Sequence, residues 1–338
     1  MKNNLSERLL FFYDHSKRVL PWRDNKNPYY IWISEIMLQQ TRVETAIPYF
    51  ERFINELPTV EALSKVEDDR LMKLWEGLGY YSRARNLKKA AIKVVEEFNG
   101  VIPNNKKELE SLSGIGPYTS GAILSIAFEQ KIAAVDGNVL RVFSRLYKIE
   151  EDIKDIKTKQ RIKELVENSL PSKRNGDYNQ AIMELGATIC RPNGRPICEE
   201  CPLEDICKAK KHHMQMVLPF QSKKAKRRME TKTVYILQYG DKYAIRKRPS
   251  QGLLASMYEF PNVEGHVGKN EIPFPSNKVK KLPNAKHIFS HIEWHMIGYL
   301  VELKIPLDDY IWKSKEEIKK EYSIPSAFKK YIKIIMED

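Results

Sequence analysis

Apolar residues recur at intervals of three and four positions through the first 189 residues of the chain. The spacing is clearest in residues 30–40 and 87–98, where it predicts amphipathic helices. Pro28 suits the first position of a helix, and Asn138 can cap the helix that follows it. Because no segment of this part alternates as a half-buried strand does, we predict an all-α domain.

The pattern changes from Thr231 onward. Short runs rich in β-branched and aromatic residues predict strands at 233–239, 242–246 and 294–303, and residues 326–336 predict a closing helix. We therefore predict a multidomain chain in which a second, α+β domain follows the helical one.

The segment between the two patterns is short and basic. Residues 208–232 hold nine Lys or Arg, two His and one acid, without sustained periodicity. We predict a helical domain over residues 1–207, a basic linker over 208–230 and an α+β domain over 231–338. The linker is either simply solvated or in contact with a DNA backbone.

Length and composition limit the class of protein. The 338 residues suffice for two domains, each with a core of its own. Charged residues break the longest apolar runs well before membrane-spanning length, and residues 1–8 are polar where a signal peptide would become apolar. We therefore expect a soluble cytoplasmic protein that does not bind a membrane.

The formal net charge of +13 favours a polyanionic partner. Residues 1–207 carry 31 basic and 30 acidic residues, so nearly the whole excess lies in residues 208–338. Charge alone does not identify the partner, but nucleic acid fits it.

All four cysteines lie within eighteen residues, separated by seven, two and five residues: Cys190, Cys198, Cys201 and Cys207. A secreted disulfide framework would spread its cysteines along the chain, whereas four thiolates this close can surround one metal ion or cluster. Zinc and an iron–sulfur cluster both accept four cysteines, and the spacing does not decide between them. Free structural thiols are the remaining alternative.

Three segments of the helical part carry further candidate residues. Gly114 and Gly116 form a turn before an apolar helix predicted at 122–128, and such a turn presents backbone N–H groups to a phosphate. Asp136 begins a helix, where a carboxylate is usually a cap. Glu35 lies in an otherwise apolar helix and either faces solvent or is desolvated with a raised pKa.

The order and spacing of the glycine turn, the Val-Asp-Gly-Asn segment and the cysteines resemble the helix-hairpin-helix DNA glycosylase superfamily. Within it, Leu-Pro-Trp-Arg at 20–23, Ser-Glu-Ile-Met-Leu-Gln-Gln-Thr at 34–41 and Gly-Leu-Gly-Tyr-Tyr-Ser-Arg-Ala-Arg-Asn at 77–86 look like the A/G-specific adenine DNA glycosylases of the MutY type. Gly-Leu-Leu-Ala-Ser-Met-Tyr-Glu-Phe-Pro at 252–261 and Phe-Ser-His at 289–291 look like the Nudix-related C-terminal domain of that family.

The resemblance implies an all-α helix-hairpin-helix glycosylase domain with an iron–sulfur cluster loop, followed by an α+β Nudix-like domain. It implies a monomeric DNA repair enzyme that hydrolyses the N-glycosidic bond of adenine paired with 8-oxoguanine or guanine in double-stranded DNA. The acidic Nudix box that binds magnesium has no counterpart in the sequence, so we expect the second domain to recognise DNA rather than hydrolyse pyrophosphate.

The resemblance also implies a [4Fe–4S] cluster on the four cysteines. The first cysteine interval has seven residues where the family usually has six. We expect the cysteines to bind the cluster despite this extra residue in the loop at 191–197.

Four residues receive catalytic roles from the resemblance. Glu35 would protonate adenine N7 and Asp136 would face the oxocarbenium carbon, because adenine is a poor leaving group as an anion. Tyr118 stands where the lyase members of the superfamily carry a lysine, and a phenol cannot form a Schiff base, so we expect a monofunctional enzyme. Tyr118 is expected to hydrogen-bond near Asp136, with Asn138 in support.

The other matched positions would recognise the DNA. Trp22, Arg23 and Gln180 would line the pocket for a flipped adenine. A further set would bind the DNA, with the glutamines and the tyrosine filling or wedging the helix and Ser290 reading the oxidised base: Gln39, Gln40, Thr41, Tyr80, Gly114, Gly116, Ser290 and His291.

Two other functions compete with this interpretation. An endonuclease III-like lyase acting on oxidised pyrimidines would share the glycine turn, the aspartate and the cluster, but Tyr118 and the second domain argue against it. A non-catalytic DNA-binding protein could use the cluster as a redox sensor. The combination of Glu35, Tyr118 and Asp136 argues against that, because phosphate binding does not need two carboxylates.

Overall fold

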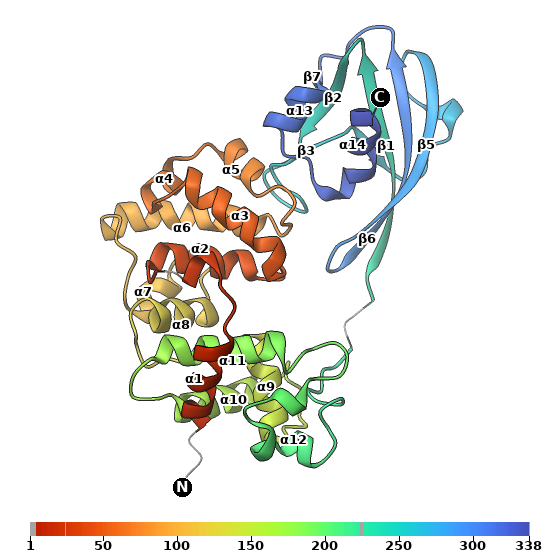
Figure 1. The fold of residues 1–338 in the computed structure, drawn as a ribbon. Coiled ribbons are helices and arrows are strands. Elements are labelled where there is room, and N and C mark those ends of the chain that lie inside the picture. Colours follow the sequence, from red (N-terminus) through yellow and green to blue (C-terminus); the bar gives the residue numbers. More distant parts are fainter. Residues whose placement is uncertain (1–4, 24, 224–225, 338) are drawn as a thin grey trace. The chain divides into compact units, whose positions relative to one another are not determined.

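The structure is a computed structural model that describes residues 5–23, 25–223 and 226–337. The chain divides into two compact units (Figure 1). The helical unit comprises Met1–Lys65 and Arg85–Lys223, and the sheet unit comprises Val66–Ala84 and Lys224–Asp338.

The described part of the helical unit contains short and medium helices, of which α6 begins in the sheet unit: α1 (Leu5–Ser16), α2 (Pro28–Leu38), α3 (Val43–Glu56), α4 (Val60–Lys65), α6 (Ser82–Phe98), α7 (Lys106–Glu110), α8 (Pro117–Ile126), α9 (Gly137–Tyr147), α10 (Ile156–Ser169), α11 (Asn175–Thr188) and α12 (Lys208–Lys211). Helix α11 packs against α1, α8 and α9. Its apolar face joins those of α1 and α9 in one core that includes Leu9, Phe143 and Ile182.

The predicted start and end signals of these helices hold only in part. Helix α2 begins at Pro28, with Asn27 as its cap, and ends at Leu38, so the predicted extension to Gln40 is wrong. The prediction that Asn138 is a cap is also wrong. Asp136 caps α9 because its carboxylate accepts the backbone N–H of Val139 at 2.8 Å, which places Asn138 in the first turn.

The sheet unit is built on a mixed sheet whose described strands run in the order β3-β2-β1-β6-β5, with β4 beside β1 and β7 beside β2. Strands β1 and β6 are parallel, and the other pairs are antiparallel. The elements are α5 (Asp68–Leu74), β1 (Arg228–Tyr239), β2 (Lys242–Lys247), β3 (Tyr258–Glu259), β4 (Asn262–Glu264), β5 (Ser276–Ile288), β6 (Ile292–Leu303), β7 (Ile311–Ser314), α13 (Lys315–Glu321) and α14 (Lys329–Glu337).

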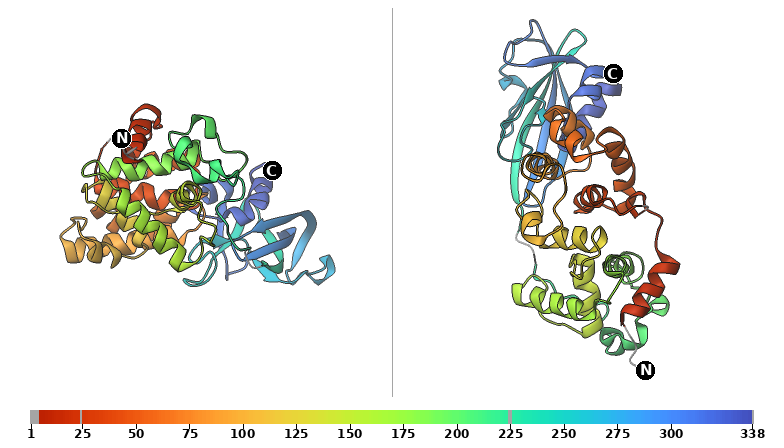
Figure 2. Two further views of the ribbon diagram at one scale, coloured as in Figure 1. Left: turned by 90° about the horizontal axis from the view of Figure 1, so that it is seen from below. Right: turned by 90° about the vertical axis from the view of Figure 1, so that its left-hand side faces the viewer.

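Both faces of the central strand β1 are covered, which explains its continuous apolar run. Val234 and Ile236 face a core that includes Tyr331 of α14. Tyr235 and Leu237 face a second core on the opposite side of the sheet. Figure 2 shows α14 lying against one face of the strands.

Two segments depart from the predicted organisation. The span 208–230, predicted as a linker, contains α12, the buried Leu218 and the first residues of β1. Residues 66–84, predicted within the helical domain, pack instead in the sheet unit. No described helix is both long and apolar enough to cross a membrane.

Candidate active site

The helical unit holds a cavity of about 760 Å³ bounded by α2, α8, α9, α10 and α11. Its volume suits a small organic ligand. Ten of the predicted site residues line it: Trp22, Arg23, Glu35, Gln39, Gln40, Thr41, Tyr118, Asp136, Asn138 and Gln180. The lining also includes polar residues that the sequence analysis did not select: Arg18, Lys159, Gln160, Lys163 and Glu184.

Glu35 is only 7% exposed, so the solvent-facing alternative is wrong. Helix α2 is apolar on most sides and therefore buries its one carboxyl along with its aliphatic residues. This burial raises the pKa of Glu35 to about 7, and the charge of Asp136 acts in the same direction. A carboxyl of this kind can hold and donate a proton near neutral pH.

Tyr118 hydrogen-bonds to Glu35, close enough to Asp136 for the charge of that carboxylate to raise the pKa of the phenol. It is the second residue of α8, which packs on α2, and its hydroxyl donates to Glu35 Oε2 at 2.5 Å. The Asp136 oxygens already accept hydrogen bonds from Val139 N–H and Asn138 Nδ2, the latter at 2.6 Å. Burial, and then the charge of Glu35, raise the pKa of Tyr118 well above its usual range, so the phenol stays protonated.

A chain of hydrogen bonds runs from Asp136 to the first cysteine. Burial raises the pKa of Asp136, and the hydrogen bonds from Val139 and Asn138 oppose that rise. Asn138 Oδ1 accepts Arg141 Nη2 at 2.8 Å, and Arg141 Nε donates to the backbone carbonyl of Cys190 at 2.8 Å. The orientation of Asp136 therefore depends on the segment that carries the cysteines.

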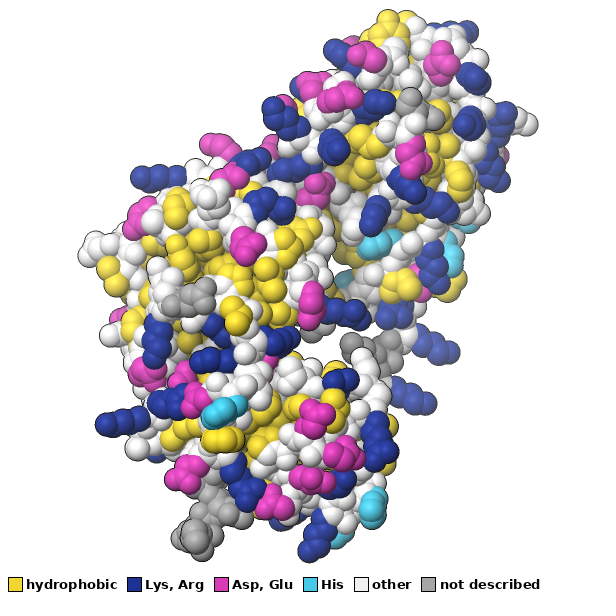
Figure 3. Space-filling model, viewed as in Figure 1, with side chains coloured by type: hydrophobic (Ala, Val, Ile, Leu, Met, Phe, Trp, Pro, Cys, Tyr) yellow, Lys and Arg dark blue, Asp and Glu magenta, His cyan; other side chains and the backbone are white. Residues whose placement is uncertain are grey.

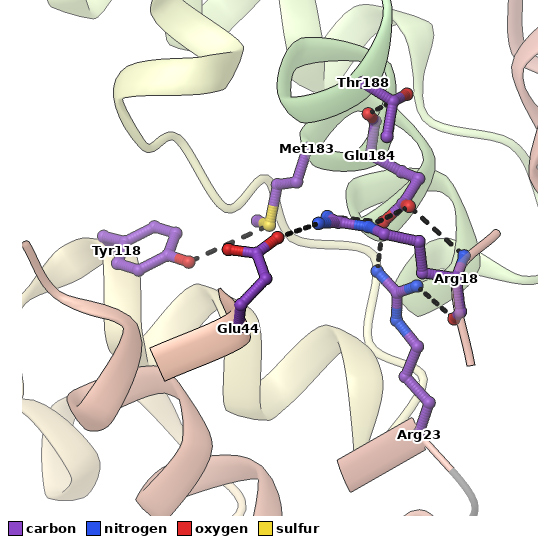
Figure 4. Close-up of polar contacts among 7 residues, drawn as sticks. All are labelled: Arg18, Arg23, Glu44, Tyr118, Met183, Glu184 and Thr188. Atoms are coloured by element: carbon purple, nitrogen blue, oxygen red, sulfur yellow. Dashed lines mark hydrogen bonds and ion pairs between the residues drawn. The ribbon is translucent and has the colours of Figure 1, made fainter. Parts of the chain in front are cut away.

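Glu184 is a site residue that the sequence analysis missed. Its side chain is fully buried and accepts Arg18 Nε at 2.6 Å and Arg23 Nη2 at 2.7 Å (Figure 4). Burial alone would raise the pKa of this carboxyl, but the two guanidinium groups hold it below its usual range. One sequence signal could have found it, because Glu184 lies four residues after Gln180 on α11 and shares its face.

The other predicted DNA-binding residues lie outside the cavity. Gly114 has φ +81° in the turn between α7 and α8, where an added Cβ would lie 2.9 Å from Asn86 Cβ. Gly116 is the N-terminal cap residue of α8. Tyr80, Ser290 and His291 belong to the sheet unit, where the Tyr80 hydroxyl lies 3.2 Å from Ser290 Oγ.

The four cysteines, all partly buried, line one small pocket together with Arg145, Lys210 and Gln215. Arg145 Nη1 donates to Cys190 Sγ at 3.2 Å. Among the described residues there is no group of three or more His, Cys, Asp or Glu placed to hold a single metal ion. The groups that could hold a metal cluster are the four cysteine thiols, which surround a common space with Arg145 and Lys210 beside them.

Comparisons with known proteins agree with this architecture. Residues 33–168 match the HhH-GPD superfamily base excision DNA repair protein family, and residues 233–333 match the NUDIX domain. A solved thermostable thymine-DNA glycosylase aligns with a TM-score of 0.56 and 29% identity, over 61% of this chain and 95% of its own. A trapped endonuclease III–DNA covalent intermediate aligns with a TM-score of 0.53 at 23% identity, over 62% and 95% of the two chains, and supports the fold alone.

Fold and cavity thus define a base-excision DNA glycosylase of the helix-hairpin-helix type with a Nudix-like second unit. The adenine DNA glycosylase of Buchnera aphidicola (from Schizaphis graminum) is 37% identical over 302 residues, which cover 87% of this chain and 86% of that protein. The human adenine DNA glycosylase is 32% identical over 96% of this chain and 73% of its own. The chain belongs to the adenine DNA glycosylases, DNA repair enzymes that hydrolyse N-glycosidic bonds.

Proposed function

We propose that this enzyme is a monofunctional glycosylase that removes adenine paired with 8-oxoguanine or guanine in double-stranded DNA. The observation that carries the proposal is the buried, proton-holding Glu35 beside Tyr118 and Asp136 in one cavity. The adenine, swung out of the duplex, would occupy that cavity beside Trp22 and Gln180.

The proposed reaction starts with proton transfer. Glu35 gives its proton to adenine N7, the C1′–N9 bond breaks, and its electron pair leaves with the base. The Asp136 carboxylate stabilises the positive charge on the sugar. Water then adds its oxygen to C1′ and returns a proton to Glu35, which leaves adenine, an abasic sugar and the enzyme in its starting state.

The phenol of Tyr118 supports monofunctional chemistry. Strand cleavage by the lyase members needs a lysine that attacks the sugar carbon, and Tyr118 stands at the matched position. Lys159 and Lys163 also line the cavity from α10, so the proposal needs a direct test for strand cleavage.

DNA contacts are proposed for both units. The turn at Gly114 and Gly116 can present backbone N–H groups to a phosphate ahead of α8. Gln39, Gln40 and Thr41 follow α2 at the edge of the cavity, and Gln40 has φ +60°. Ser290 and His291 are exposed on the loop between β5 and β6, where Ser290 would contact the oxidised base.

We also propose that the four cysteines hold a [4Fe–4S] cluster. Four thiols around a common space, with Arg145 and Lys210 beside them to offset negative charge, fit such a group. When bound, the cluster would supply a structural cross-link of the loop at 190–207 and a redox-active centre.

The test is single-turnover adenine release from a duplex with one A:8-oxoguanine pair. Glu35→Gln and Asp136→Asn are each expected to slow release by about a hundred- to ten-thousand-fold while DNA binding persists, because each loses a catalytic charge or proton. Wild-type protein should release adenine without cutting the strand. Near wild-type release in either variant would remove that residue from the mechanism, and strand cleavage by wild type would contradict monofunctional chemistry.

A further inference from the structure

Residues 66–84 lie between two stretches of the helical unit in sequence but pack within the sheet unit. The segment contains α5, the start of α6 and the turn that carries Tyr80. Tyr80 has φ +48° and is half exposed, so burial alone does not fix its side chain.

Asp69 provides one anchor of this segment. Its Oδ1 lies 2.6 Å from Lys247 Nζ at the end of β2, and its Oδ2 accepts the hydroxyl of Tyr258 on β3 at 2.7 Å. One carboxylate thus joins α5 to two strands of the sheet. Hydrogen bonds to an ionised acceptor are stronger than those between two neutral groups.

Glu76 provides a second anchor, just before the turn. Its Oε1 accepts the backbone N–H of Ile324 at 2.8 Å, and its Oε2 accepts Lys73 Nζ at 2.7 Å. Lys73 in turn donates to the carbonyl of Tyr322 at 3.0 Å. The end of α5 is therefore held on the segment that follows α13.

The turn after these anchors is internally stiff. The Trp75 indole donates to Gly79 O at 3.2 Å, and Arg83 Nη2 donates to the same carbonyl at 3.0 Å. The Arg83 guanidinium also lies over the rings of Trp75 and Tyr80, 5.3 and 5.7 Å from their centroids. A displacement of the anchors would thus be passed on to Tyr80.

We propose that Asp69 and Glu76 are positioning residues for recognition of the base opposite the adenine, because they hold Tyr80 beside Ser290. The contact between Tyr80 and Ser290 joins exposed hydroxyls 210 positions apart, and such a bond is too weak to order a turn by itself. The inference rests on the proposed function and adds that discrimination depends on two carboxylates outside the catalytic cavity.

The matched variants are Asp69→Asn, Glu76→Gln and the control Glu67→Gln. Glu67 is exposed, precedes α5 and makes no side-chain cap bond, so the control removes the same charge without an anchor. The ratio of single-turnover adenine-excision rates on A:8-oxoguanine and A:G duplexes is the measurement. Each anchor variant is expected to lower the ratio about tenfold, the equivalent of one missing hydrogen bond to a charged group, and the control to leave it unchanged.

Hydrogen exchange of residues 77–81 in the free protein gives a readout without substrate. Both anchor variants are expected to exchange faster there, and Glu67→Gln at the wild-type rate. Excision ratios equal to wild type in both anchor variants would overturn the inference and leave the proposed function intact. Wild-type protein that releases adenine from neither duplex would overturn the proposed function instead, whereas unchanged exchange in both variants would overturn the anchoring itself.

Discussion

Glu35 carries its carboxyl on a helix that buries it, and that burial raises its pKa to about 7. Two of its polar neighbours act on this pKa in opposite directions. The hydrogen bond from Tyr118 favours the ionised form and lowers the pKa, whereas the charge of Asp136 disfavours that form and raises it. Near neutral pH a substantial share of Glu35 is therefore protonated, as a general acid requires.

The pH dependence of adenine release should report these opposite effects. In wild type we expect the rate to fall as pH rises through about 7, because the acid loses its proton there. Tyr118→Phe should move this fall in rate to higher pH, because it removes the hydrogen bond that lowers the pKa of Glu35. In Asp136→Asn the residual rate should fall at lower pH, because the charge that raises the pKa of Glu35 is lost. Single-turnover rates across pH 5 to about 9 decide the matter, and shifts of both variants in the same direction would contradict the assignment.

The same pKa shift has a consequence for stability. The folded-state pKa of Glu35, about 7, lies above its ordinary value of 4.5, so the folded protein binds more protons than the unfolded chain between these values. The contribution of Glu35 to the free energy of unfolding is fully present below pH 4.5 and is lost as pH rises through about 7. Protonation thus favours both the fold and the proposed chemistry.

At the scale of helices and strands, the sequence predicts those elements whose apolar pattern is strong. Helices α2 and α6 and strand β1 have such patterns. The cap and the proline at the start of α2 give a further local signal. Strand β5 is missed because it carries four lysines and Pro283, and pairs at the edge of the sheet where few of its side chains are buried.

Contacts between residues far apart in the sequence limit how much of the candidate site can be predicted from local motifs. Glu35 and Asp136 can be selected from local motifs, yet the bond from Tyr118 to Glu35 depends on how α8 packs on α2. The role of Glu184 likewise depends on two arginines more than 160 positions away. The anchoring of residues 66–84 in the sheet unit has no local signal at all, since its partners are near residues 247, 258 and 324.

Helix α11 approaches the start of α9 through Gly186. A Cβ at this position would lie 2.7 Å from Asn138 Cβ, which is closer than packed atoms allow. Gly186→Ala should therefore lower the free energy of unfolding by about 1–3 kcal/mol and slow adenine release, because α9 carries Asp136. Gly137→Ala is the control, since nothing lies within 4 Å of its Cβ position. Urea unfolding gives the free energy of unfolding of both variants. Equal midpoints for Gly186→Ala and Gly137→Ala would contradict the close approach.

The loop of the cysteines is attached to α9 by Arg145. This side chain is buried and donates to the carbonyls of Leu218 at 2.8 Å and Arg191 at 3.0 Å, and to Cys190. Wild-type protein is expected to contain about four iron and four sulfide per chain. Arg145→Met should retain less, because the buried carbonyl of Leu218 and the partly buried carbonyl of Arg191 lose their donor.

Arg195→Met is the matched control for Arg145→Met. Its side chain is 75% exposed on the same loop, so the change removes one positive charge without a buried contact. Iron content after aerobic purification is the measurement. Equal iron in the two variants would remove Arg145 from this role, and zinc in place of iron in wild type would contradict the cluster itself.

At the scale of the whole molecule, nearly all of the excess positive charge lies in residues 208–338, most of which belong to the sheet unit. Lys and Arg side chains are spread over its visible face (Figure 3). On β5, three exposed lysines make no ion pair within the described part of the chain: Lys278, Lys280 and Lys281. They have two physical explanations, since lysines at a sheet edge can bind DNA phosphates or discourage pairing with another strand.

Changing the three lysines to glutamine separates these explanations. If they neutralise phosphates, affinity for A:8-oxoguanine and A:G duplexes should fall alike, and the slope of log affinity against log salt should become shallower by about 0.9 for each phosphate that is no longer neutralised. The ratio of excision rates on the two duplexes should not change. Ser290→Ala should do the reverse, because it keeps the net charge and removes one group proposed to contact the base. A triple variant with the wild-type salt slope but concentration-dependent self-association would instead assign the lysines to protection of the β5 edge.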